Sequence, residues 1–177
     1  MMKKILILIT CCFLFSGAVF AQSQAEISRD NEGNKVLKGI ISRQELETDT
    51  SFSWWAENLK GYTPQSQALS ELKKNHNIEF IAFIGTWCSD SKFIIPKFYS
   101  FIDAAGFPAD RITLIGVDRS KKTLSHLAEA MNIVDVPTII VMKDGKEAGR
   151  VVEYGKYGLF DKELGEIIAS IPASPAQ

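Results

Sequence analysis

The sequence predicts an α/β domain, a central mixed sheet flanked by helices, preceded by an N-terminal extension. Three observations lead to this fold class. From about residue 61 onward, short apolar runs alternate with segments of helical hydrophobic spacing, which is the pattern of helix-linked parallel strands. Near the C-terminus, Asp144-Gly145 separates two strand-like runs and predicts an antiparallel hairpin. The 177 residues, 46% of them hydrophobic, suit one such domain with appendages.

The start of the chain predicts a secretory signal peptide over residues 1–21. Lys3 and Lys4 form a short basic region, residues 5–20 are almost wholly apolar, and Ala21 is a small residue at the cleavage position. After cleavage we expect the protein to be periplasmic or secreted, with no membrane attachment.

Two alternatives to cleavage stay open. An uncleaved anchor would need ~20 apolar residues to span the bilayer, and the run here is shorter and interrupted by Ser16-Gly17. Lipidation of Cys11 or Cys12 would follow an unusually short apolar region. If cleavage occurs, both cysteines leave with the signal. Cys88 is then the remaining thiol, in a compartment that favours disulfides.

Residues 22–60 are predicted to form the N-terminal extension. Its polar first part, to about residue 34, is expected to be a mobile leader. Residues 36–41 have the composition of a short strand. Asp49 or Ser51 can cap a helix over residues 52–59.

Residues 61–172 carry the main domain, and residues 173–177 are a tail. The first helix begins with Thr63-Pro64, which is typical of an N-cap followed by proline. The first strand, 78–84, is apolar almost throughout, as expected of a strand covered on both faces. Helices are expected over residues 63–75, 89–104, 124–131 and 159–171, and strands over residues 78–84, 112–117, 138–142 and 147–153.

A short motif follows the first of these strands. It reads Trp87-Cys88-Ser89-Asp90-Ser91, and Pro96 stands eight residues after Cys88 within the next predicted helix. The motif resembles the active-site turn of the thioredoxin family, with serine in place of the second cysteine. The order of helices and strands from about residue 61 to 171 is also similar to that family. The resemblance implies a thioredoxin fold and thiol–disulfide exchange with protein or low-molecular-weight thiols and disulfides.

Cys88 and Ser91 are the candidate catalytic residues. Cys88 stands where a strand ends and a helix begins, and the free N–H groups and positive dipole of a helix N-terminus stabilise a thiolate. Ser91 is able to donate a hydrogen bond to the same sulfur, whereas the carboxylate of Asp90 opposes a second negative charge. A hydroxyl group cannot form a disulfide, so Ser91 cannot resolve a mixed disulfide at Cys88.

The resemblance also implies substrate-binding residues. Val136-Pro137 matches the position of the family's cis-proline, which faces the active-site turn, and the residue before that proline offers its backbone to an extended peptide. Trp87 is expected to shield the cysteine. Many thioredoxins carry an acidic residue six positions before the cysteine and a lysine in the next strand. Here the first position is Ala82, and residues 112–117 contain no lysine.

Three functions are compatible with these residues. The first is a monothiol protein of the cell envelope that forms mixed disulfides through Cys88 and needs an external thiol to resolve them. The second is a redox-inactive thioredoxin-like module that binds peptides, and the third is a thiol sensor oxidised to sulfenic acid. A net charge of −1 gives no electrostatic case for nucleic acid. No cofactor or metal site is expected, and the oligomeric state stays open.

Overall fold

A computed structural model describes residues 25–172 of the protein. The strands are β1 (Ala25–Arg29), β2 (Lys35–Ile41), β3 (Glu79–Ile84), β4 (Ile112–Gly116), β5 (Thr138–Lys143) and β6 (Lys146–Val152). The helices are α2 (Arg43–Thr48), α3 (Trp54–Asn58), α4 (Ser66–Lys74), α5 (Ser89–Ala105), α6 (Leu127–Ala130) and α7 (Phe160–Ala169), with 3-10 turns at Thr50–Phe52, Ala109–Arg111 and Leu124–His126.

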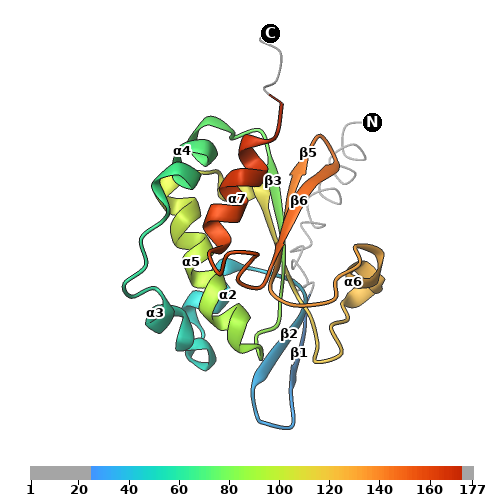
Figure 1. Ribbon diagram of the computed structural model, residues 1–177. Helices are drawn as coiled ribbons and strands as arrows, with labels where there is room; N and C mark the ends of the chain where they lie inside the picture. The colour runs from blue at the N-terminus through green and yellow to red at the C-terminus, as the bar shows by residue number, and fades with distance from the viewer. Residues whose placement is uncertain (1–24, 173–177) are drawn as a thin grey trace, which may run out of the picture.

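The six strands form one mixed sheet in the order β1-β2-β4-β3-β5-β6 (Figure 1). The central strand β3 pairs in parallel with β4 and antiparallel with β5. The remaining pairs, β1 with β2, β2 with β4 and β5 with β6, are antiparallel. The predicted α/β class with a central mixed sheet is therefore confirmed.

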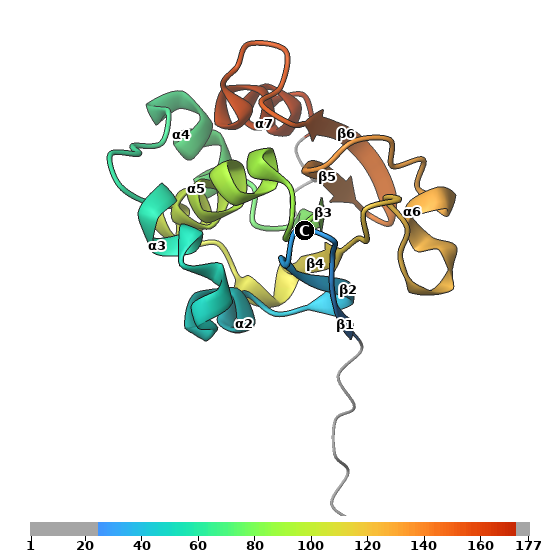
Figure 2. The same cartoon turned by 90° about the horizontal axis from the view of Figure 1, so that it is seen from below.

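Helices cover the two faces of the sheet unequally, as Figure 1 and, from below, Figure 2 show. The larger core lies under α2, α3, α4, α5 and α7 and contains an edge-to-face pair, Phe80 and Phe98, with ring centroids 5.3 Å apart. The smaller core lies under α6 and includes Phe83 and Val136. Cys88 packs against this smaller core, so the candidate site stands at its margin.

The predicted signal peptide and the predicted tail lie outside the described residues. Within residues 25–172, no helix is both long enough and apolar enough to cross a bilayer.

The prediction of a mobile leader is wrong for residues 25–34, which form β1 and the turn into β2. Asp30 closes this turn, since its carboxylate accepts hydrogen bonds from the N–H groups of Glu32 at 3.0 Å and Asn34 at 2.9 Å. Arg119, distant in sequence, also donates to Asp30 at 2.8 Å. Composition suggested disorder because these residues bury little apolar surface, but strand pairing and a remote cation order them.

The extension also differs from the single predicted helix over 52–59. Helix α2 was not predicted; it is capped by the Ser42 hydroxyl, which accepts from the Glu45 N–H at 3.1 Å. Asp49 caps the 3-10 turn instead, and α3 follows as a separate short helix. Trp55 of α3 is buried with its ring centroid 5.6 Å from that of Tyr99 in α5. The extension therefore packs on the helix that begins after Cys88.

Two further helix boundaries differ from the prediction. Thr63-Pro64 precedes α4, whose N-cap is Gln65, and the Gln65 N–H donates to the buried carboxylate of Asp161 at 2.9 Å. The predicted helix over 124–131 is reduced to the single turn α6. Ser125 and His126 have φ angles of 57° and 55°, outside the helical range.

Acidification is expected to loosen the extension first. Burial opposes ionisation of Asp30, but hydrogen bonds from Arg119 and Asn34 outweigh it and lower its pKa to about 2. The hydrogen bond from Lys35 likewise lowers the pKa of Asp49 to about 2. Both carboxyl groups titrate near 3.8 when unfolded, so their stabilisation is complete above about pH 5 and is lost as the pH falls from about 5 to 2.

Urea unfolding between pH 6 and pH 2 measures this effect. Asp30→Asn should flatten the acid limb of the stability profile relative to the wild type, since asparagine does not titrate. Asp110→Asn removes an exposed carboxylate and serves as the matched control. Equal acid limbs in the two variants would contradict the assignment of the loss to Asp30.

Candidate functional site

Cys88 occupies the N-cap position of α5, a helix of 17 residues. The turn between β3 and α5 is closed by the Cys88 N–H, which donates to the Gly85 carbonyl at 2.9 Å. The Cys88 carbonyl in turn accepts the first helical hydrogen bond, from the Lys92 N–H at 3.0 Å. The cysteine is partly exposed, so its thiol lies at the surface end of the central strand.

The thiol of Cys88 lies against the backbone of the predicted peptide site. Its Sγ donates to the Val136 carbonyl oxygen at 3.2 Å, across 48 positions of sequence. The peptide bond between Val136 and Pro137 is cis. β5 begins directly after this proline and pairs with β3. Strand pairing therefore brings Cys88, Val136 and Pro137 to the same end of the sheet.

The predicted hydrogen bond from Ser91 to the Cys88 sulfur is not formed in this structure. Its side chain is fully buried, and its Oγ accepts a hydrogen bond from the Gly85 N–H at 3.1 Å. Ser91 thus holds the backbone of the turn, while the Cys88 thiol donates to the Val136 carbonyl. Sequence spacing placed the two side chains on the same helical turn but did not give their orientations.

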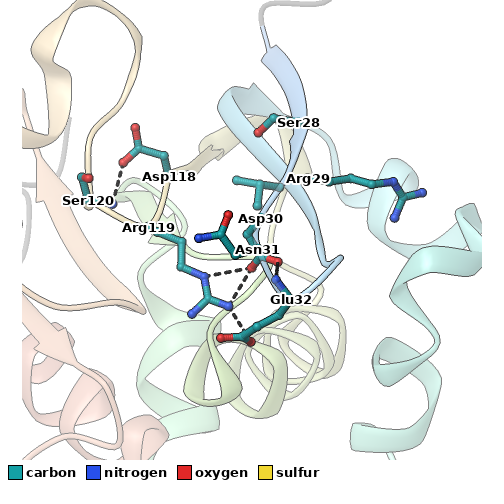
Figure 3. A pocket seen from close by; sticks show the side chains of 9 residues that line it. Ser28, Arg29, Asp30, Asn31, Glu32, Asp118, Arg119 and Ser120 are labelled. Carbon is teal, nitrogen blue, oxygen red and sulfur yellow. Dashed lines mark hydrogen bonds and ion pairs between the residues drawn. The ribbon is translucent and has the colours of Figure 1, made fainter.

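Trp87 is fixed from two directions. Its indole Nε1 donates to the Val117 carbonyl at 3.0 Å, and the guanidinium carbon of Arg119 lies 5.1 Å from the centre of its ring. Arg119 also pairs with the carboxylates of Asp30 at 2.7 Å and Glu32 at 2.6 Å (Figure 3). The arginine therefore joins the N-terminal hairpin to the turn that carries Cys88. No local pattern in the sequence indicates this role.

Thr86 makes a second connection between the extension and the turn. Its buried hydroxyl donates to the Lys35 carbonyl at 2.8 Å and accepts from the Leu37 N–H at 3.2 Å. Thr86 lies two residues before Cys88, so β2 is hydrogen bonded to the turn that carries Cys88. The predicted extension therefore helps to hold the turn that carries Cys88 in place.

The opposite flank of the turn carries aromatic side chains. The Tyr154 hydroxyl donates to Asp90 at 2.9 Å, and burial together with this bond raises the pKa of Tyr154. The ring centroids of Tyr154 and Phe93 are 5.7 Å apart, and the Nζ of Lys97 lies 3.3 Å from the centre of the Phe93 ring. Burial lowers the pKa of Lys97. Tyr154 was not among the predicted site residues, because it lies 64 positions from Asp90 and no local pattern links the two.

A central β3, a helix that starts with cysteine, and a cis-proline before β5 define a thioredoxin-fold domain. The sequence profile described as Thioredoxin matches residues 63–162, so the chain belongs to the thioredoxin family.

Individual comparisons give the degree of similarity. A thioredoxin H-type protein of Oryza sativa subsp. indica is 32% identical over 108 residues, which cover 59% of this chain and 84% of that protein. A thioredoxin of Chlamydia pneumoniae is 34% identical over 84 residues, or 48% of this chain and 72% of the relative. The crystal structure of oxidised thioredoxin O2 from Arabidopsis thaliana aligns with a TM-score of 0.38 and 21% identity. The alignment covers 59% of this chain and 83% of that one.

Proposed function

We propose that the protein performs monothiol thiol–disulfide exchange through Cys88 in the cell envelope. The observation that carries the proposal is the placement of Cys88, partly exposed at the start of α5 and in contact with the Val136 carbonyl beside the cis peptide bond. An extended peptide that pairs with the backbone at Val136 would bring its own sulfur toward Cys88.

The reaction has two steps. The thiolate of Cys88 attacks one sulfur of a substrate disulfide, which forms a mixed disulfide and releases the other sulfur as a thiolate. A second, external thiolate then attacks the mixed disulfide, restores Cys88 and leaves with the bound sulfur. The N–H groups at the start of α5 favour the thiolate that begins the first step.

The second step depends on an external thiol because residues 61–172 contain no second cysteine that could resolve a mixed disulfide at Cys88. Ser91 occupies the position of the family's second cysteine and bonds to the Gly85 N–H. Ala82 stands where many thioredoxins have an acid that assists resolution. The other two cysteines, Cys11 and Cys12, fall within the proposed signal peptide.

The proposed location follows from the N-terminal sequence. A signal peptide over residues 1–21 would direct the chain to the periplasm or the outside of the cell, leaving an extension over 22–60 and a thioredoxin-like domain over 61–172. An oxidising compartment supplies the disulfides that the first step needs.

Intact mass measurement after incubation with oxidised glutathione tests the proposal. We expect one glutathione adduct per chain, its removal by a small thiol, and no adduct in Cys88→Ser. The same spectrum reports the N-terminus and shows whether the chain begins at Gln22. A folded protein that forms no adduct, while the urea-unfolded protein does, would contradict exchange at Cys88.

A redox-inactive peptide-binding module is the second candidate. The serine at position 91 favours it, because its hydroxyl bonds to the Gly85 N–H and cannot resolve a mixed disulfide. The module would bind an extended peptide along Val136 and Pro137 with equal affinity in the wild type and in Cys88→Ser. Peptide binding without any mixed disulfide would favour this candidate over exchange.

A further inference from the structure

A polar cavity lies beside the active-site turn, between the N-terminal hairpin and the start of α5. Its volume is about 260 Å³, and its wall includes Arg29, Lys35, Trp54, Thr86 and Lys92. We call it the hairpin cavity. Thr86 precedes Cys88 by two residues and Lys92 follows it by four. The cavity wall therefore includes one residue shortly before Cys88 in the sequence and one shortly after it.

The hairpin cavity and the peptide site lie on different flanks of Cys88. The strand order places β2 beyond β4 on one side of β3, whereas β5, with Pro137 before it, lies on the other side. A peptide bound along Val136 and Pro137 would thus leave the hairpin cavity free.

Only some of the cationic side chains that line the hairpin cavity are paired with a carboxylate. Lys35 pairs with Asp49, and the cavity's own carboxylate, Glu32, pairs with Arg119 at 2.6 Å. Arg29 instead donates to the neutral Gly33 carbonyl at 2.9 Å.

Likewise, the Nζ of Lys92 donates to the neutral side-chain oxygen of Asn34 at 3.4 Å. Within residues 25–172, no carboxylate forms an ion pair with Arg29 or Lys92 in this structure. These two side chains are therefore available to an external anion.

Lys92 is also well placed relative to the sulfur. The Lys92 N–H donates to the Cys88 carbonyl at 3.0 Å, so the first helical hydrogen bond of α5 joins the two residues. A carboxylate held by Lys92 and Arg29 would therefore belong to a molecule whose sulfur lies within reach of Cys88. Two or three carbon atoms between sulfur and carboxylate suit residues one helical turn apart.

We propose that the hairpin cavity binds a carboxylate of a low-molecular-weight disulfide or thiol that reacts at Cys88. The inference rests on the proposed exchange function and gives it a substrate class. Cys88 attacks one sulfur of the carboxylate-bearing disulfide, a mixed disulfide forms, and the other half leaves as a thiolate. A thiol of the same class would bind in the same cavity and resolve adducts.

Rates of adduct formation with three disulfides of matched length test the inference. Dithiodipropionate carries carboxylates, bis(hydroxyethyl) disulfide is neutral, and cystamine carries ammonium groups. For each protein, the rate with the anionic compound is divided by the rate with the neutral one. This ratio cancels any general change in the reactivity of Cys88.

Arg29→Gln and Lys92→Gln should each lower this anionic-to-neutral ratio about two- to fivefold, the range expected for one solvent-exposed charge pair. Both should raise the relative rate with cystamine. The loss should shrink as salt is added, because salt screens exposed charges. Lys60→Gln and Arg111→Gln remove exposed cations elsewhere on the surface and should leave the ratio unchanged.

The outcomes separate this inference from the proposed function. If all three disulfides react but Arg29→Gln and Lys92→Gln behave like the two control variants, the carboxylate site is wrong and exchange stands. If none of the three forms an adduct, exchange itself is wrong. A disulfide peptide with glutamate beside its cysteine forms a separate arm. Sensitivity to Arg29→Gln in that arm alone would assign the cavity to acidic proteins and overturn the low-molecular-weight class.

Discussion

Ser91→Cys is expected to convert the protein from a monothiol into a dithiol that reduces insulin with dithiothreitol as the reductant. The wild type should stay near background in this assay. The variant should exceed it by at least about a hundredfold, because a well-placed intramolecular thiol acts at an effective concentration far above that of an external one. Position 91 is buried on the first turn of α5 and matches the spacing of the family's two cysteines.

The control for this prediction is Ser89→Cys. It adds a thiol to the same turn, at an exposed position next to Cys88 and with the wrong spacing. We expect it to remain near background. A folded Ser91→Cys protein with two titratable thiols and no insulin reduction would show that serine at position 91 is not what prevents resolution.

Gly116→Ala is expected to lower the free energy of unfolding by about 3 kcal/mol, at the upper end of the range for overpacking. A Cβ at position 116 would lie 2.2 Å from the carbonyl oxygen of Leu37 in β2. β2 would have to move away from β4, and the backbone atoms involved cannot rotate aside as a flexible side chain can. The loss should centre on the attachment of the extension to the sheet.

Denaturant unfolding and hydrogen exchange measure the two parts of this prediction. Amide protection over residues 35–41 should fall in Gly116→Ala, whereas protection in β3 and β5 should fall less. Thr113→Ala changes an exposed residue of the same strand and should cost less than about 1 kcal/mol. Full stability and full protection of β2 in Gly116→Ala would mean that β2 and β4 pair less closely than described.

Local patterns in the sequence were enough for most of the main domain. The apolar run at 78–84 and the Asp144-Gly145 turn predicted β3 and the β5–β6 hairpin, and both are present in the structure. α5 ends at Ala105, one residue beyond the predicted end, where Gly106 has a φ of 64°. These features depend on hydrophobic periodicity and on turn residues, which act over a few neighbouring positions.

The ordered structure of the extension was not predicted because it depends on contacts with residues that are distant in the sequence. β1 is polar and mostly exposed, and it forms through pairing with β2. Its turn is held by Asp30 and by Arg119, which are 89 positions apart. No short-range pattern contains that information. A polar leader was therefore the natural prediction for a segment that the fold orders.

The sequence alone determined the α/β class, the family resemblance, and the nomination of Cys88, Ser91, Val136 and Pro137. Only the tertiary structure decided how these residues are used. The Cys88 thiol turns to the Val136 carbonyl, and the Ser91 hydroxyl turns to the Gly85 N–H. Spacing along a helix fixes which residues are near one another. The direction of each side chain depends on hydrogen-bond partners that other strands bring to the turn.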